Sequence, residues 1–126
     1  MSERHPTTIG ITIDCPDADA AATFWERFSG YRRRPHRADS PYVTIERPDG
    51  ADAPDGPPHL TFQTVPEAKV HKARLHLDLF VDHARPMVDE MVAAGATVIS
   101  TTEAGEWTTR VLQDPAGNEL CVIGPE

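Results

Sequence analysis

The chain has few aromatic residues, only two cysteines and no long apolar segment. Aromatic side chains make up 6% of its 126 residues, so aliphatic side chains must supply most of a hydrophobic core. No stretch approaches the roughly 20 apolar residues of a membrane span. The polar opening segment 1–8 lacks the apolar centre of a secretory signal. We therefore expect no membrane partner and a cytoplasmic location, with Cys15 and Cys121 kept as thiols.

An excess of positive charge is also missing. Twelve basic residues stand against twenty acidic ones, for a formal net charge of −8. Such a chain repels nucleic acid, so no nucleic-acid partner is expected. The basic residues gather in one run, at Arg32, Arg33, Arg34, His36 and Arg37. This run predicts a solvated strand and turn or, as an alternative, an anion-binding rim.

Two segments alternate apolar and polar residues with the period of half-buried strands, 9–14 and 75–81. A helix is predicted after each of them, over 17–29 and 83–94, and a glycine follows each helix. Asp17 is expected to cap the first helix, and either of the residues at 82 and 83 can cap the second.

Matching landmarks recur at a nearly constant spacing. Gly10 and His76 are 66 residues apart (76 − 10), and Gly30 and Gly95 are 65 apart (95 − 30). Pro48 and Pro115 are 67 apart (115 − 48). This spacing predicts a duplicated unit of one strand, one helix and three strands. Two copies are too few for a solenoid, so a closed pair is favoured.

The remaining strands follow from alternation and from turn residues. They are expected near 31–36, 41–46 and 58–64 in the first unit, and near 97–101, 106–113 and 118–123 in the second. Segment 50–58 is rich in glycine, proline and aspartate and predicts a loop, and 64–72 links the units. The predicted fold is one α+β domain over 1–126, with module one at about 7–64 and module two at about 73–124.

Three local patterns occur in a fixed order along the chain. They are Cys15-Pro16-Asp17 followed by Phe24-Trp25 and Gly30, then His76-Leu77-Asp78-Leu79 followed by Gly95-Ala96, then Asp114-Pro115-Ala116-Gly117-Asn118. In this order, over about 8–123, the sequence resembles the vicinal oxygen chelate superfamily of glyoxalases, bleomycin-resistance proteins and extradiol dioxygenases, and most of all its glyoxalase-like subgroup. The resemblance implies two βαβββ modules whose paired half-barrel sheets carry helices on the convex side and enclose a ligand cleft.

The resemblance also implies where metal ligands would stand. The family's ligand positions on the first and last strand of each module correspond here to Gly10, Thr61, His76 and Cys121. Only His76 keeps the usual ligand type. We therefore expect no resident metal and no other cofactor. If a divalent metal does bind, the expected ligands are His76, Cys121 and Glu119.

Strand alternation adds candidates for contact with a small molecule, while no catalytic residue can be assigned. The expected ligand-binding residues are His76, Thr61, Gln63, Cys121, Asp78, Trp107 and Arg110. Each has a structural alternative, such as inert packing for Cys121 and Trp107 or a hydrogen bond to a neighbour for His76. His59 is expected on the same strand face as Thr61.

Two functions follow from these residues and the resemblance. The first is a bleomycin-resistance-like protein that binds a small organic molecule in the cleft between the modules without a metal. The alternative is a metal-dependent lyase, isomerase or dioxygenase that uses His76 with Cys121 or Glu119. A homodimer is expected in both cases, because the open sheet edges need covering.

Overall fold

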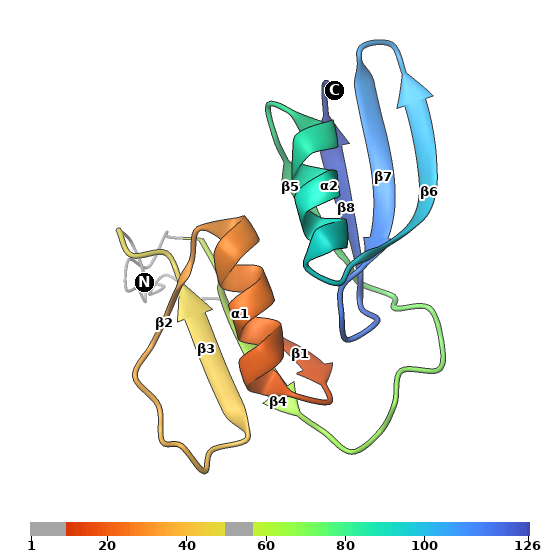
Figure 1. Ribbon diagram of the computed structural model, residues 1–126. Helices are drawn as coiled ribbons and strands as arrows, with labels where there is room; N and C mark the ends of the chain where they lie inside the picture. The colour runs from red at the N-terminus through yellow and green to blue at the C-terminus, as the bar shows by residue number, and fades with distance from the viewer. Residues whose placement is uncertain (1–9, 50–56) are drawn as a thin grey trace, which may run out of the picture. The chain divides into compact units, whose positions relative to one another are not determined.

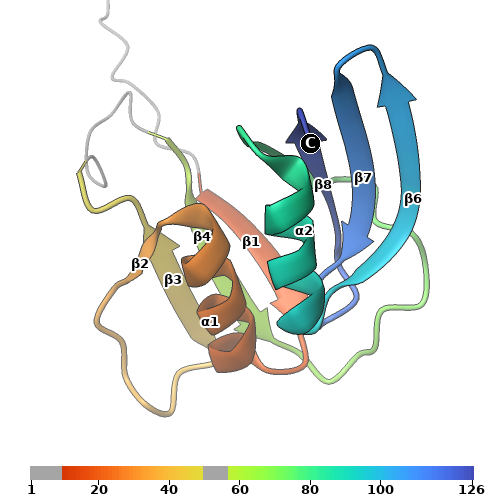
Figure 2. The same cartoon turned by 45° about the horizontal axis from the view of Figure 1, so that its top comes forward.

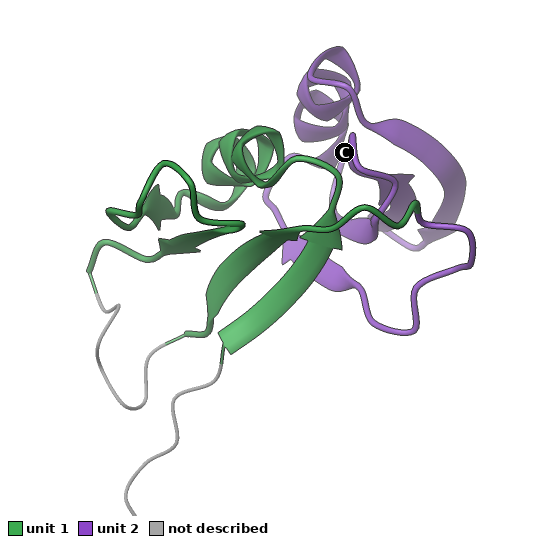
Figure 3. Ribbon diagram, turned by 90° about the horizontal axis from the view of Figure 1, so that it is seen from below, with its two compact units in different colours: residues 1–68 green, residues 69–126 purple. Residues whose placement is uncertain are grey.

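The computed structural model describes residues 10–49 and 57–126. The polar segment 1–8 and most of the predicted loop 50–58 lie outside the described residues. The chain divides into two compact units, 1–68 and 69–126 (Figure 3). Each unit holds one helix and a four-stranded sheet in the order strand, helix, strand, strand, strand (Figure 1). The predicted α+β fold with two similar βαβββ modules is thus confirmed.

The first unit places its opening strand beside its last. Its elements are β1 (Gly10–Cys15), α1 (Ala18–Ser29), β2 (Arg32–Arg33), β3 (Tyr42–Glu46) and β4 (His59–Thr64). The strand order is β1-β4-β3-β2, and only the β1–β4 pair is parallel. Strand β2 is shorter than the predicted 31–36, and Pro35, which has no N–H to donate, lies just beyond its end.

Helix α1 begins and ends as its sequence predicts. The Asp17 carboxylate accepts a hydrogen bond from the Ala20 N–H at 3.2 Å, and Gly30 takes the left-handed conformation at φ 75°. The helix packs on β3 and β4 (Figure 2). Its buried aromatic side chains meet the buried aliphatic and aromatic residues of those strands, which are Phe24, Trp25, Phe28, Val43, Ile45, Leu60 and Phe62.

The second unit repeats this arrangement. Its elements are β5 (Leu77–Phe80), α2 (Ala84–Ala93), β6 (Thr97–Ala104), β7 (Trp107–Gln113) and β8 (Glu119–Gly124). The strand order β5-β8-β7-β6 matches the first sheet, with β5 parallel to β8. His83 is the N-cap of α2 without a side-chain cap bond, and Ala94 is the C-cap, one residue before Gly95 at φ 110°.

The helix of each unit covers one face of its own sheet, and we call the opposite side the helix-free face. On β4 the buried Leu60 and Phe62 alternate with the half-buried Thr61 and Gln63, which lie on the helix-free face. In the second sheet, the helix-free face carries Cys121 on β8 and its cross-strand partner Asp78 on β5. Among the described residues, no helix is long and apolar enough to cross a membrane.

Candidate functional site

Side chains on the helix-free face of the first sheet are linked across β3 and β4. The register pairs Thr44 with Thr61 and Tyr42 with Gln63. The two threonine hydroxyls lie 2.8 Å apart, and the Gln63 amide donates to the Tyr42 hydroxyl at 3.4 Å. The structure therefore places the predicted residues Thr61 and Gln63 on the expected face. Each is held by a partner on β3 that the sequence analysis did not name.

Gly10 lies under the imidazole of His59. The two residues are partners in the parallel β1–β4 register. A Cβ added at Gly10 would stand 2.2 Å from His59 Nε2 and 2.7 Å from Cε1. The ring thus occupies the space that a side chain at position 10 would need. His59 Nδ1 is buried and has no hydrogen-bond partner among residues 10–49 and 57–126. Position 10 has no side chain, but its neighbour puts an imidazole over the same spot.

A pocket of about 510 Å³ opens beside β3. It lies between the connection that follows β2 and the helix-free face of β3. Its lining residues are Arg34, Pro35, His36, Arg37, Ser40, Pro41, Tyr42 and Thr44. None of the seven predicted ligand-binding residues lines it. Thr61 and Gln63 are hydrogen-bonded to two residues that do line it, Thr44 and Tyr42. The signal that could have located the pocket is the basic run 32–37, read as an anion-binding rim.

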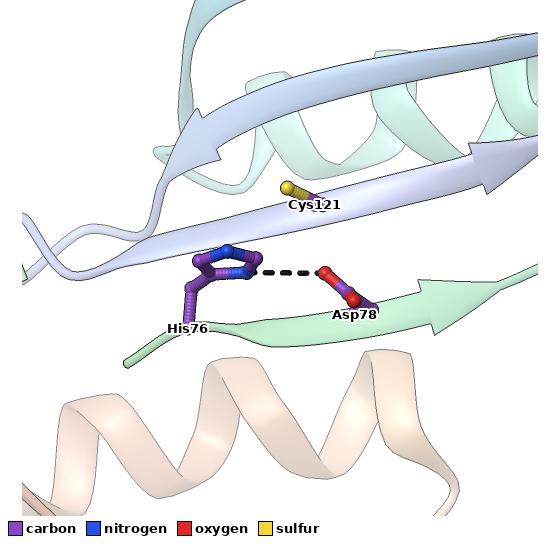
Figure 4. A group of neighbouring side chains, drawn as sticks. All are labelled: His76, Asp78 and Cys121. Atoms are coloured by element: carbon purple, nitrogen blue, oxygen red, sulfur yellow. Dashed lines mark ion pairs between the residues drawn. The ribbon is translucent and has the colours of Figure 1, made fainter. Parts of the chain in front are cut away.

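The helix-free face of the second sheet brings three predicted residues together, His76, Asp78 and Cys121 (Figure 4). His76 Nδ1 lies 3.1 Å from Asp78 Oδ1. Asp78 is the register partner of Cys121 on β8. One donor atom from each residue lies within 4.8 Å of the other two. The imidazole and the carboxylate are about two-fifths exposed, whereas Cys121 is buried.

The Cys121 thiol holds its proton in this setting. Burial raises its pKa above the usual 9.0, and the negative charge of Asp78 and a hydrogen bond to that carboxylate raise it further. A protonated thiol is a poor nucleophile and a poor ligand. Cys121 therefore stays unreactive by itself. A bound cation would favour the thiolate by opposing the charge of Asp78.

Glu119 is engaged elsewhere. Its carboxylate accepts from Lys69 Nζ at 2.8 Å and from the Ala73 N–H at 3.2 Å. Burial acts to raise the pKa of Glu119, but these hydrogen bonds and the Lys69 charge together outweigh burial and lower it. The structure thus groups Asp78, and not Glu119, with His76 and Cys121.

Trp107 and Arg110 lie on opposite faces of β7. Trp107 packs edge-on against Phe80 at 6.5 Å between ring centroids. It shares the helix-free face with Cys121, whose register partner is Val111. Arg110 pairs with Val122 on the other face. Its guanidinium donates two hydrogen bonds to Glu126, at 2.9 and 2.6 Å. The structure does not bring Arg110 together with His76, Asp78 and Cys121.

The family model for the glyoxalase-like domain matches residues 10–123. The chain belongs to the glyoxalase-like family. Among curated proteins, no sequence matches this glyoxalase-like chain.

Solved structures give the same fold at low identity. A glyoxalase/bleomycin resistance protein/dioxygenase family enzyme from Burkholderia phytofirmans is 19% identical, with a TM-score of 0.68 over 92% of this chain and 96% of that one. A glyoxalase family protein from Bacillus cereus is 12% identical, with a TM-score of 0.69 over 98% and 96%. A lactoylglutathione lyase from Agrobacterium tumefaciens is 14% identical, with a TM-score of 0.61 over 97% and 96%. At these identities the likeness establishes the fold.

The four positions at which the resemblance implies metal ligands differ in how well they suit a metal. Gly10 offers no donor, and the Thr61 hydroxyl is shared with Thr44. His76 and Cys121 lie beside Asp78, and an imidazole, a carboxylate and a thiol that has lost its proton are donors that zinc accepts. The donor set of the second sheet therefore fits a metal, and the two positions of the first sheet do not.

Proposed function

We propose that this glyoxalase-like protein binds a small organic molecule at the helix-free face of its first sheet and does so without a resident metal. The observation that carries the proposal is the pocket of about 510 Å³ beside β3. Its volume falls within the roughly 300–1,000 Å³ of small-molecule sites. Hydroxyl, guanidinium, imidazole and proline groups line it, so a ligand can be held by hydrogen bonds, charge and apolar contact.

The three hydroxyl groups of the pocket already have hydrogen-bond partners within the protein. Thr44 is held by the Thr61 hydroxyl and Tyr42 by the Gln63 amide. The chain enters β3 through two further bonds, from the Tyr42 N–H to the Ser40 hydroxyl at 3.2 Å and from the Thr64 N–H to the Pro41 carbonyl at 2.8 Å. Groups that are already ordered lose less entropy on binding, which favours affinity. Thr61 and Gln63 thus act as positioning residues in this proposal.

Isothermal titration against a panel of metabolites and antibiotics tests the proposal. We expect a binder whose affinity is unchanged by a chelator and which is recovered unmodified. Thr44→Val removes one pocket hydroxyl and should weaken binding by about threefold to tenfold, the worth of one hydrogen bond. Thr12→Val is the matched control, because Thr12 lies on β1 outside the pocket. Equal losses in the two variants, or turnover that requires a metal, would contradict the proposal.

A second candidate function is metal-dependent chemistry of the lyase, isomerase or dioxygenase type. The observation that favours it is the group of three donors on the second sheet, His76, Asp78 and Cys121. A bound metal would supply Lewis-acid activation of a substrate oxygen. The chain's own part would be to hold the cation through these three side chains, which already lie together through the His76–Asp78 contact and the hydrogen bond between Cys121 and Asp78.

Elemental analysis of protein purified without chelator decides between the two functions. For the enzyme we expect stoichiometric zinc, nickel, iron or manganese that is lost in His76→Ala and kept in His71→Ala. His71 is the matched control because it belongs to the same unit but not to the donor group. Stoichiometric metal that persists in His76→Ala would place it elsewhere, and metal-free wild-type protein would exclude resident-metal chemistry at this group.

We further propose that the protein is a cytoplasmic homodimer. All eight residues of the edge strand β6 are exposed, and an exposed edge is open to pairing with another chain. Neither cysteine forms a disulfide, as a reducing compartment requires. Light scattering should give twice 13.8 kDa, and a value of 13.8 kDa at high concentration would refute the dimer.

A further inference from the structure

We infer that the pocket beside β3 selects a small organic carboxylate, whose charged group is bound by Arg34. This inference rests on the proposed function and names the ligand class of the same pocket. Its basis is the chemistry of the lining: three basic side chains, three hydroxyl groups and no acidic side chain among the eight lining residues. In a chain with a net charge of −8, these lining side chains are basic, although each also faces an acidic residue outside the lining.

Arg34 is the residue best placed to bind a carboxylate. Its backbone N–H donates to the Thr44 carbonyl at 2.8 Å, which continues the antiparallel β2–β3 ladder and sets Arg34 opposite Thr44. Its Nε is paired with Glu46. Among the described residues, neither Nη1 nor Nη2 meets an acceptor. The two terminal nitrogens form a fork that matches a carboxylate bidentately.

The charges around the pocket favour one negative charge over two. Each basic lining residue already has an acidic neighbour: Arg34 pairs with Glu46, Asp39 lies 3.4 Å from Arg37, and Asp19 lies 3.9 Å from His36. A carboxylate bound by the Arg34 fork adds one negative charge to these pairs. A phosphate dianion adds two, and each extra charge must be offset when it leaves water. We therefore assign a carboxylate and not a phosphate.

The rest of the lining suits the organic part of such a ligand. Pro35, Pro41 and the half-exposed ring of Tyr42 offer apolar surface. The Tyr42 hydroxyl accepts from Gln63, so its own proton is available for donation to a ligand oxygen. Arg33, the neighbour of Arg34, turns to the helix side and bonds Asp19 and Glu26 on α1. The alternation of the strand thus directs Arg34 to the pocket and Arg33 away from it.

The test is a titration of isotope-labelled protein followed by amide chemical shifts. Benzoate, its neutral isostere benzamide and inorganic phosphate are the three probes. We expect benzoate to shift the amides of Ser40, Tyr42 and Thr44, and to bind more tightly than the other two. Arg34→Gln should weaken benzoate by about tenfold, the value of a charge-assisted pair. Arg32→Gln is the matched control, because Arg32 belongs to the same basic run but does not line the pocket.

The relative affinities of the three probes separate the carboxylate assignment from the proposed binding function. Equal binding of benzoate and benzamide would overturn the carboxylate assignment and leave the proposed binding function standing. Tighter binding of phosphate than of benzoate would also overturn the assignment, because the pocket would then prefer phosphate to a carboxylate. Failure of all three probes to shift the pocket amides would overturn both the assignment and the proposed function. Arg34→Lys keeps the charge without the fork. Unchanged amide shifts far from the pocket in this variant show that it is folded, and full benzoate affinity in it would refute the bidentate geometry.

Discussion

The contact between Gly10 and His59 predicts a mutation whose effect reverses with the genetic background. Gly10→Ala should destabilise the native protein, because the new Cβ would stand 2.2 Å from His59 Nε2 where ordinary contact begins at 3.4 Å. The ring must then move by at least 1.2 Å (3.4 − 2.2). Overpacking costs about 1–3 kcal/mol in general, and the cost here should lie near 1 kcal/mol because the obstructing atoms are the far end of a side chain that can rotate.

In a His59→Ala background the obstruction is gone. Gly10 does not adopt a positive φ, so an alanine there suffers no backbone strain. Glycine inside a strand costs about 0.5–1 kcal/mol relative to alanine, so the same substitution should now stabilise the protein by that amount. The two effects differ in sign, and the coupling energy of the double-mutant cycle should reach about 1.5–2 kcal/mol.

Urea unfolding of the wild type, both single variants and the double variant measures this coupling. Gly105→Ala is the matched control, since Gly105 has φ 64° and nothing within 4 Å of an added Cβ. It should cost about 1–2 kcal/mol through backbone strain in both backgrounds, with no coupling to His59. A coupling between positions 10 and 59 below about 0.5 kcal/mol would refute the steric reasoning.

Three further predictions concern the second unit. Gly124→Ala should destabilise by about 3 kcal/mol or more, because its Cβ would meet the Val81 backbone oxygen at 2.1 Å and a backbone atom cannot rotate away; unfolding in urea checks this. Asp78→Asn should lower the pKa of Cys121 and speed its alkylation by iodoacetamide at pH 8, with Cys15 as the internal reference in peptide mass spectrometry; an unchanged rate would count against it. Glu119 has a lowered pKa, so its stabilising effect is present above its unfolded pKa of about 4.5 and is lost as the pH falls through its lower folded pKa. Lys69→Met should flatten this acid dependence in unfolding experiments between pH 6 and pH 3, and an unaltered slope would refute the assignment.

The repeated βαβββ order could be predicted from sequence because its signals are local. Alternation, the Asp17 cap and the glycine after α1 each act within a few residues, and the structure confirms them. Alternation also predicts which face each β7 side chain occupies: positions 107 and 110 differ by three, so Trp107 and Arg110 lie on opposite faces. The two predicted ligand-binding residues of β7 therefore do not share a face.

The candidate sites depended on information that is not local. The partnership of Asp78 with Cys121 is set by the register of two parallel strands 43 residues apart in sequence (121 − 78), which periodicity alone does not determine. The pocket depends on the path of the connection between β2 and β3, where Arg34 rather than Arg33 is turned to the helix-free face. A basic run shows the charge, but only the strand pairing shows which arginine is available.

The loss of a ligand type at one position of a duplicated fold need not remove that group from the face. In a parallel strand pair, neighbouring residues in register stand about 4.8 Å apart and point to the same side. An imidazole on β4 in register with a β1 position therefore stands one strand spacing away, on the same helix-free face. This is the arrangement at Gly10 and His59, where the missing side chain and the ring that fills its space are register partners. The first-strand position at which the resemblance implies a ligand is therefore a glycine whose cross-strand neighbour is a histidine, and the pair together keeps an imidazole on this face.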